Sequence, residues 1–230
     1  MHGSQLPVAR LNFINLMGET MKNSVRLGIG FLFAAVFAAG TTQAAMIGDP
    51  KAGKDKSAMC AGCHGDKGMS PAPNFPHLAG QYQKYIERQM LDYQNGKRVD
   101  PMMTDMAKAV TDMQDLMDIA AYFASQKRMA GKSSTNKELV AKGKKIFLEG
   151  NPATGVYACS NCHGENGYGK DAKNDLFPLI HGQTKDYLLK QMNDYRSGER
   201  HNDPAGMMGN IAKKMTDEEI AAVVEFMAGM

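Results

Sequence analysis

The sequence predicts an all-α protein in which two similar helical domains follow one another. Near the end of each half, apolar residues recur at helical spacing, and no segment alternates apolar and polar residues as a half-buried strand would. The second half also repeats the motifs of the first half in the same order. The clearest helical stripes are Leu116, Ile119, Ala120 and Phe123, and then Ile220, Val223, Val224 and Met227.

Both closing helices carry a start signal. Thr111 stands three residues before Gln114, and Thr216 stands three before Glu219, which is the spacing of a capping box. Earlier stripes predict a central helix in each half, and weaker ones predict helices over 52–59 and 139–148. The central stripes are Tyr82, Tyr85, Ile86, Met90 and Tyr93, and then Leu188, Met192 and Tyr195.

The repeat is seen most clearly around the cysteines. Cys60-Ala-Gly-Cys63-His64-Gly recurs as Cys159-Ser-Asn-Cys162-His163-Gly, and the pairs Phe-Pro, Gly-Gln and Gln-Met follow in both halves. The separation between matching residues grows from 99 to 105 along the chain, which indicates short loop insertions in a duplicated domain. A polar stretch at 131–136 divides the copies, so we expect domains over 45–131 and 132–230.

The N-terminal segment 1–44 reads as a secretory signal peptide. A basic head with Lys22 and Arg26 precedes an apolar run over 27–39, and Thr42-Gln-Ala44 forms a small-residue cleavage site. The run is shorter than the ~20 residues that a membrane span needs. We expect cleavage after Ala44 and export to the periplasm, and we expect residues 1–20 to reflect an upstream start codon.

The composition excludes a dedicated nucleic-acid-binding protein. The net charge is +3, and charged residues make up 22% of the 230 residues, which is close to balance. The chain has 19 methionines and only 4 cysteines. All four cysteines fall into the repeated motif, so the motif decides their chemistry.

Cys-x-x-Cys-His is the attachment pattern of a c-type haem. Two cysteines three residues apart on a helical turn face the same side, where they match the two vinyl groups, and the adjacent histidine reaches the iron. The sequence therefore predicts two covalent haem c groups, with thioethers from the four cysteines and with His64 and His163 as iron ligands. A Cys₄ zinc site, a redox dithiol and two disulfides all leave the adjacent histidines unexplained.

Methionine is the expected second ligand of each iron. Met103 and Met208 occupy equivalent places in the repeat, eight residues before the threonines at the start of the closing helices, and we expect both in loops. Met102 and Met106 compete with Met103, and Met207 competes with Met208. Most of the other methionines are expected to fill the core.

Two repeated arginines, Arg98 and Arg200, are candidate partners for haem propionates, because a guanidinium binds carboxylates well. Tyr93 and Tyr195 could reach the same groups, and ordinary helix-end packing is the alternative for all four. The remaining histidines, His77, His181 and His201, are not repeated, so we expect them at the surface or at a haem edge and not as ligands.

These residues resemble the di-haem cytochromes c of the cytochrome c4 type over about 46–230. Besides the two haem motifs, the resemblance rests on the segments Asn74–Gln81 and Phe177–Gln183 and on Met103–Ala107 and Met208–Ala212. It implies two class I cytochrome c domains related by approximate two-fold symmetry, His/Met ligation of both irons, and peripheral membrane association. It also implies periplasmic electron delivery toward terminal oxidases or other respiratory enzymes.

Two departures from the resemblance affect the site. The second copy has an extra loop, Gly150–Gly155, before its haem motif. The first copy has one more residue between Thr111 and the first apolar position of its closing helix, which leaves Met102 open as an alternative to Met103.

Three functions fit this pattern. The leading hypothesis is a periplasmic carrier that moves single electrons from respiratory donor proteins to a terminal oxidase or reductase, with no catalytic residues. The second is a haem subunit of a dehydrogenase complex, such as the partner of a flavoprotein. The third is a two-haem enzyme, either a peroxidase or a thiosulfate dehydrogenase, which would need an open or unusual position at one iron.

Overall fold

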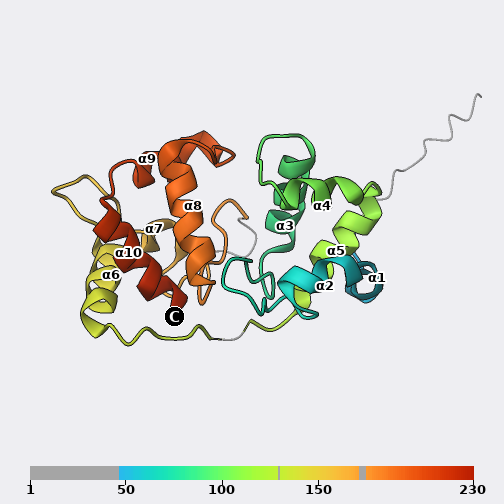
Figure 1. Ribbon diagram of the computed structural model, residues 1–230, viewed down its shortest axis with the longest axis horizontal. Helices are drawn as coiled ribbons and strands as arrows, with labels where there is room; N and C mark the ends of the chain where they lie inside the picture. The colour runs from blue at the N-terminus through green and yellow to red at the C-terminus, as the bar shows by residue number, and fades with distance from the viewer. Residues whose placement is uncertain (1–46, 129, 171–174) are drawn as a thin grey trace, which may run out of the picture. The chain divides into compact units, whose positions relative to one another are not determined.

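The computed structural model describes residues 47–128, 130–170 and 175–230, all within one compact unit that spans Ala44–Met230. These residues form helices joined by loops (Figure 1), and their only β-type pairing is an isolated bridge between Asn151 and Val156. The predicted all-α class is therefore confirmed. The predicted signal peptide lies outside the described residues. Within them, no helix is both long enough and apolar enough to cross a bilayer.

Each half runs through the same series of helices, from an opening helix to a long closing one. In the first half these are α1 (Pro50–Lys56), α2 (Ala58–His64), α3 (Gln83–Gln94), α4 (Met103–Ala109) and α5 (Met113–Ser125). In the second half they are α6 (Lys137–Glu149), α7 (Ser160–His163), α8 (Lys185–Ser197), the 3₁₀ turn η1 (Pro204–Gly206), α9 (Met207–Ala212) and α10 (Asp217–Ala228).

The opening helix packs closely against the closing helix in both halves, and a glycine lies at each crossing. A Cβ atom on Gly53 of α1 would lie 1.9 Å from the carbonyl oxygen of Asp118 in α5. A Cβ atom on Gly143 of α6 would lie 1.9 Å from the carbonyl oxygen of Ala222 in α10. Only a residue without a side chain allows the backbones to approach so closely.

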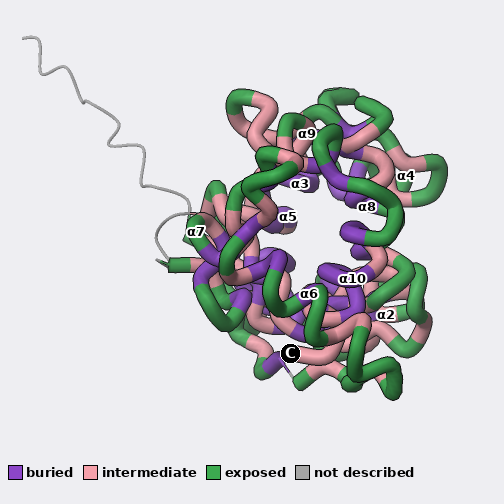
Figure 2. Tube along the Cα trace, turned by 90° about the vertical axis from the view of Figure 1, so that its left-hand side faces the viewer, coloured by how far each residue is buried: buried purple, intermediate pink, exposed green. Residues whose placement is uncertain are grey.

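Each half has its own apolar core, built from the stripes that the sequence predicts. Figure 2 shows the buried segments in purple, with exposed segments in green around them. Phe123 and Phe147 are among the largest fully buried side chains of the two cores. Ile86, Met90 and Tyr93 of α3 and Leu188, Met192 and Tyr195 of α8 are buried as expected. The expected helix over 139–148 is α6, whereas the one expected over 52–59 is divided into α1 and α2 at Ser57.

The start of the closing helix agrees with the prediction in the second half only. Thr216 caps α10 in a complete capping box with Glu219. In the first half the cap of α5 is Asp112, whose side chain accepts from the N–H of Asp115 at 3.0 Å, so the prediction for Thr111 was wrong. An aspartate caps a helix at least as well as a threonine does, so the capping-box spacing of Thr111 and Gln114 was not enough to decide the cap.

The extra loop of the second half is closed by its own backbone. The N–H of Asn151 donates to the carbonyl of Val156 at 2.8 Å, and the N–H of Val156 donates back at 3.0 Å. The side chain of Asn151 also donates to Glu219 Oε1 at 2.6 Å, which fastens the loop to the start of α10. The insertion therefore leaves the helix series of this half intact.

Asp118 of α5 ties the start of the first half to its closing helix and gives a pH-dependent prediction. Its carboxylate accepts from the N–H of Asp49 at 2.8 Å and from Lys56 Nζ at 2.5 Å, with Asp115 also paired to Lys56. Mainly the Asp49 hydrogen bond, and then the Lys56 ammonium, lower the pKa of Asp118 from its usual 3.8 to about 2.

A lowered carboxyl pKa stabilises the folded state above the unfolded pKa, and this stabilisation is lost as pH falls through the folded pKa. Asp118→Asn should therefore lower the free energy of unfolding at pH 7, and the difference from wild type should shrink as pH falls from 3.8 toward about 2. Urea unfolding followed across this range measures the difference. Asp55→Asn serves as the control, since among the described residues its exposed carboxylate forms no hydrogen bond or ion pair. A pH-independent deficit for Asp118→Asn would contradict the prediction.

Candidate functional site

The four cysteines lie on short helical turns in the two halves. Cys60 and Cys63 are in α2, Cys159 caps α7 and Cys162 lies within it. All four thiols are free and half-buried, so neither pair is a disulfide. Burial raises the pKa of Cys60 and raises that of Cys159 to about 11, which keeps both thiols protonated at neutral pH. Both pairs therefore have thiols available to bond to an outside group.

The adjacent histidines are held in the same way in both halves. His64 and His163 are each 7% exposed, and each places Nδ1 at 2.9 Å from a proline carbonyl oxygen, that of Pro76 and that of Pro178 respectively. Because a carbonyl only accepts, Nδ1 must carry the proton and the lone pair must be on Nε2. Burial lowers the pKa of both imidazoles, so they are neutral at pH 7.

A neutral imidazole with a free Nε2 lone pair is the form that ligates a metal. A carbonyl that accepts from the other ring nitrogen fixes the tautomer and the ring orientation. The rings of Phe75 and Phe177 stand edge-on to the two imidazoles, with centroids 6.3 and 6.4 Å away. The two halves thus present the same donor in the same surroundings.

Met103 and Met208 also occupy equivalent places, although not in loops as expected. Met103 is the first residue of α4 and Met208 the second of α9, and both are half-buried against the core of their half. The N–H of Met103 donates to Asp100 Oδ1 at 3.1 Å, and that of Met208 donates to Asp203 Oδ2 at 2.7 Å. An Asp-Pro pair precedes each of these helices, and its aspartate holds the backbone of the methionine at the helix start.

The extra residue of the first half does not disturb the methionine positions. Met103 and Met208 each stand four residues before a fully buried alanine, Ala107 or Ala212. The extra residue is Thr111, which follows this helix and precedes the true cap, Asp112. The main competitor, Met102, is 53% exposed and points away from the core.

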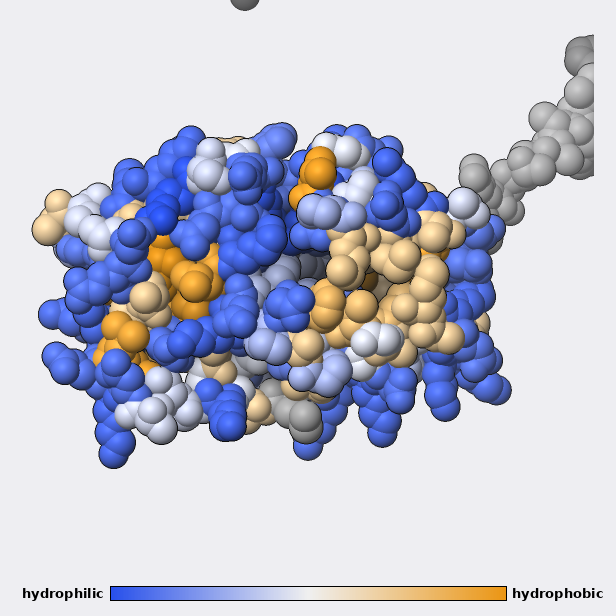
Figure 3. Space-filling model, viewed as in Figure 1, coloured by the Kyte–Doolittle hydropathy of each residue, from blue (hydrophilic) through white to orange (hydrophobic). Residues whose placement is uncertain are grey.

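Some of the other methionines lie at the surface and not in the core. Met59, Met102, Met106 and Met113, all in the first half, are among the exposed large apolar residues. In Figure 3 the half on the right, which holds α1 to α5, carries a broad pale orange area. The second half exposes no methionine to this degree among its described residues. The exposed methionines are therefore a feature of one half, whereas Met103 and Met208 belong to both.

Arg98 and Arg200 lie buried between the halves, each only 6% exposed, so neither guanidinium is solvated. Arg98 donates to Gln89 Oε1 of its own half at 2.7 Å. Across the interface it donates to Gln191 Oε1 at 2.7 Å and to the Tyr187 hydroxyl at 3.1 Å.

Arg200 makes the reciprocal contacts. It donates to Gln191 Oε1 at 2.7 Å, to Gln89 Oε1 at 3.0 Å and to the Tyr85 hydroxyl at 3.1 Å. Its Nε donates to Asn202 Oδ1 at 3.0 Å. All the acceptors of the two arginines are amides or hydroxyls, and among the described residues no carboxylate forms an ion pair with either guanidinium.

Tyr93 and Tyr195 lie under these arginines. The guanidinium carbon of Arg98 is 4.7 Å from the ring centroid of Tyr93, and that of Arg200 is 4.5 Å from the centroid of Tyr195. Such stacking holds a guanidinium in a fixed plane and gives a cation–π attraction. The four residues thus form two matching pairs at the interface.

The three remaining histidines differ from one another. The Nδ1 atom of His77 accepts from the N–H of Ser70 at 2.9 Å, and burial, Arg128 and His64 together lower its pKa to about 4. His181 stacks on Tyr168 with centroids 4.2 Å apart, and His201 is exposed. His77 and His181 each have a contact of their own, which accounts for them without a metal.

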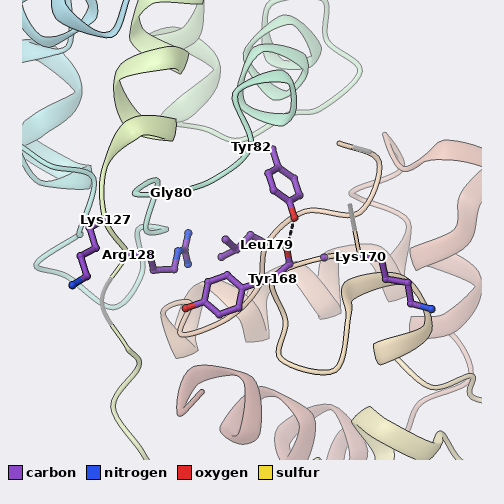
Figure 4. Close-up of a pocket in the computed structure, with 8 residues that line it drawn as sticks. Gly80, Tyr82, Lys127, Arg128, Tyr168, Lys170 and Leu179 are labelled. Carbon is purple, nitrogen blue, oxygen red and sulfur yellow. Dashed lines mark hydrogen bonds between the residues drawn. The ribbon is translucent and has the colours of Figure 1, made fainter. Parts of the chain in front are cut away.

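A hollow of about 570 Å³ lies where the two halves meet (Figure 4), and Tyr82 donates across it to the carbonyl of Tyr168. Arg128, on one wall, donates to the carbonyls of Ala79, His77 and His181 at 2.9, 3.1 and 2.9 Å. Its described lining contains none of the cysteine, histidine or methionine candidates. This hollow therefore exposes the interface and is not the ligand site.

Several functional residues were not assigned by the sequence analysis. The proline carbonyls and the repeated Asp-Pro pairs were visible in the repeat, and the repeated Gln89 and Gln191 were noted without a role. Arg128 belongs to none of the repeated motifs. No sequence signal points to it.

The residues present fit a covalent haem in each half. Free thiols three residues apart, a neutral histidine with Nε2 unengaged and a half-buried thioether are the donors that such a group uses. The described residues contain no group of three or more His, Cys, Asp or Glu side chains that could hold a metal ion. A Cys₄ zinc site would need the two cysteine pairs to meet, and they lie in different halves without forming such a group. This finding argues against the zinc alternative.

Comparisons with known proteins agree with this site. The cytochrome c family model matches residues 51–127 and 140–230. Cytochrome c4 of Pseudomonas aeruginosa is 45% identical over 184 residues, covering 80% of this chain and 89% of that protein. The thiosulfate dehydrogenase electron acceptor of Stutzerimonas stutzeri is 35% identical, covering 77% of this chain and 82% of that protein.

Among solved structures, the reduced recombinant cytochrome c4 from Pseudomonas stutzeri superposes with a TM-score of 0.74 at 39% identity. The match covers 80% of this chain and 99% of that one. The family model is matched twice, as the duplicated motif requires, and the structural match spans both halves. The chain therefore belongs to the cytochrome c4 family of di-haem electron-transfer cytochromes, with two covalently bound haem c groups.

Proposed function

We propose that this cytochrome is an exported carrier that moves single electrons in the periplasm from respiratory donors to a terminal oxidase or reductase. In each half the cysteine pair would form the haem thioethers, and the iron would be held by His64 with Met103 in the first half and by His163 with Met208 in the second. One observation carries this proposal: both halves hold the same buried histidine, with Nδ1 at 2.9 Å from a proline carbonyl. An enzyme would need the two sites to differ at one iron.

The bound haem supplies a one-electron Fe(III)/Fe(II) couple. The histidine, oriented by its proline carbonyl, offers Nε2, and the methionine thioether favours the reduced form and so raises the potential. Neither residue needs to move or to exchange a proton when the electron arrives. The helices that carry both ligands pack on the apolar cores, which keeps the ligands in place between the two redox states.

Arg98 and Arg200 are proposed to face haem propionates. Both cations are buried at the interface without a carboxylate partner among the described residues, and burying an unpaired charge is costly. The carboxylates of two attached haems would supply the missing negative charge. The hydrogen bonds of Arg98 and Arg200 to glutamine and tyrosine leave the guanidinium planes stacked on the tyrosine rings. Both guanidinium groups are thus held in a fixed position for a contact with a propionate.

A second function has a specific observation in its favour. A relative that covers most of this chain is named a thiosulfate dehydrogenase electron acceptor, so this chain could serve as the accepting partner of a dehydrogenase. In that case the purified cytochrome would be reduced rapidly by one dehydrogenase and only slowly by general respiratory donors. Stopped-flow reduction with each donor separates the two functions.

The absorption spectrum of the purified, exported protein tests the ligation. We expect the weak far-red band of methionine–iron(III) bonds with the intensity of two haems, and no binding of carbon monoxide to the reduced protein. A mature N-terminus at Ala45 would support export and cleavage. High-spin features, or a band with the intensity of one haem, would instead favour a two-haem enzyme.

A further inference from the structure

The peptide group between Pro76 and His77 is hydrogen-bonded on both sides. Its carbonyl accepts from Nδ1 of His64 at 2.9 Å. Its N–H donates to Oε1 of Gln183, a residue of the opposite half, at 2.6 Å. One peptide unit therefore connects the proximal histidine of the first half with a side chain of the second half.

The same arrangement recurs in the opposite direction. The carbonyl of the peptide between Pro178 and Leu179 accepts from Nδ1 of His163 at 2.9 Å, and its N–H donates to Oε1 of Gln81 at 3.0 Å. Gln81 also donates through Nε2 to the carbonyl of Leu179 at 2.8 Å. Both hydrogen bonds, from histidine to peptide carbonyl and from peptide N–H to glutamine, are thus present in each half. The two sets cross the interface in opposite directions.

The glutamines are fixed tightly enough to act on these peptides. Gln81 and Gln183 are each 5% exposed, so water does not compete for their amides. Gln183 donates through Nε2 to the carbonyl of His77 at 2.9 Å, in the same way that Gln81 clamps Leu179. With two hydrogen bonds to one residue, the amide cannot rotate away without losing both.

We propose that Gln183 tunes the haem of the first half and that Gln81 tunes the haem of the second half, each through the peptide that accepts from the proximal histidine. The inference rests on the proposed function, in which His64 and His163 ligate the irons. Both glutamines are positioning residues, since neither touches a ligand directly. Each half would then set part of the reduction potential of the other.

The direction of the effect follows from hydrogen-bond cooperativity. An N–H group that donates makes the carbonyl of the same peptide a stronger acceptor. A stronger acceptor at Nδ1–H raises the basicity of a ligating histidine. A more basic histidine favours Fe(III) and lowers the potential. Loss of Gln183 should therefore raise the potential of the first-half haem and leave the second nearly unchanged.

The size of the shift in potential can be estimated from the effect of residues that bind a ligating histidine directly. Removing a direct partner of a ligating histidine costs about 10–100-fold in metal affinity, and the glutamine acts one peptide further away. We therefore expect about a threefold to tenfold change in the Fe(III)/Fe(II) equilibrium, or roughly 30–60 mV for a one-electron couple. The Gln183 contact is shorter than the Gln81 contact, so Gln183 should give the larger shift.

Thr184 offers a matched control. Its hydroxyl donates across the same interface to the carbonyl of Phe75 at 3.0 Å, but the peptide between Phe75 and Pro76 has no N–H and accepts nothing from His64. Thr184→Val removes an interface hydrogen bond of similar length next to Gln183. It should therefore move neither potential if the effect runs through the peptide and not through a looser interface.

The test measures both potentials in the full-length holoprotein for Gln183→Met, Gln81→Met and Thr184→Val. Each haem is followed separately by its hyperfine-shifted NMR signals, assigned with Met103→Ala and Met208→Ala. Gln183→Met should raise the first-half potential and Gln81→Met the second-half potential. Gln183→Asn, which keeps the amide but shortens its reach, repeats the test if the methionine variant does not fold.

Three results would overturn the inference: a shift at the haem of the mutated half, equal shifts at both haems, or the same shift in Thr184→Val. A wild-type protein without two low-spin, methionine-ligated haems would overturn the proposed function itself. Since the wild-type spectrum is recorded before the variants are compared, the two failures are distinguished.

Discussion

Met103→Ala is expected to abolish half of the far-red methionine–iron(III) band and to leave the other half unchanged. Met208→Ala should remove the complementary half. In each variant the haem of the altered half loses its thioether and should bind carbon monoxide when reduced. Axial ligands set haem potentials over a range of about 0.8 V, so the potential should fall by well over the ~59 mV of a tenfold change.

The neighbouring methionines provide matched controls for this prediction. Met102 is 53% exposed and Met106 40% exposed, so Met102→Ala and Met106→Ala should leave the band and both potentials unchanged. Potentiometric titration and absorption spectroscopy of the four alanine variants record all of these quantities. Loss of the band in Met102→Ala instead of Met103→Ala would move the ligand by one residue and would show that the start of α4 shifts when the haem is attached.

Because exposed methionines are concentrated in the first half, Met103→Ala alone is not a sufficient test of its ligand. The first half exposes two thioethers near the start of α4, those of Met102 and Met106, and either could replace a lost ligand. A double variant, Met102→Ala with Met103→Ala, removes the nearest substitute. If its spectrum equals that of Met103→Ala, no neighbouring thioether takes the vacant position.

Local patterns were sufficient to predict the elements that bear the ligands. Helical spacing located α3, α5, α8 and α10, because each packs one apolar stripe on a core. The cysteine-histidine motif located both haem sites, because its chemistry lies within five consecutive residues. The cap of α5 was not predicted correctly. Thr111 and Asp112 are adjacent and both can cap, so only the backbone shows that Asp112 does so.

Contacts across the interface could not be predicted in this way. The repeat showed that Arg98 and Arg200 matter, yet a repeated residue in a duplicated protein can contact its own half or the other copy, and the sequence does not distinguish these cases. Arg98 and Gln191 are 93 residues apart and form a reciprocal set with Arg200 and Gln89. Reciprocal contacts of this kind are typical of two-fold related surfaces.

The second large effect is expected on stability, at the glycines where the opening and closing helices cross. Gly143→Ala should destabilise the second half, because the new Cβ would lie 1.9 Å from the carbonyl oxygen of Ala222 and 3.1 Å from Cβ of Phe226. This carbonyl oxygen belongs to the backbone and cannot rotate aside as the end of a flexible side chain can. The helices α6 and α10 must therefore move apart. Overpacking of this kind costs about 1–3 kcal/mol, and we expect the upper end of that range.

Gly53→Ala tests the same crossing in the first half, where the Cβ would lie 1.9 Å from the carbonyl oxygen of Asp118 and 2.9 Å from Cβ of Tyr122. The sign of the effect is informative, because alanine is intrinsically better than glycine in a helix by about 0.5–1 kcal/mol. Gly62→Ala in α2 isolates that helical preference, since a Cβ there would meet nothing within 4 Å.

Urea unfolding of the holoprotein should therefore separate Gly62→Ala from the other two variants. Gly62→Ala should be equal to wild type or slightly more stable, whereas Gly53→Ala and Gly143→Ala should unfold at clearly lower urea. If Gly143→Ala were instead stabilised by about 1 kcal/mol, helix preference alone would account for it. The two helices would then have room for a side chain between them, and the close crossing would not fix the position of the haem motif that follows each opening helix.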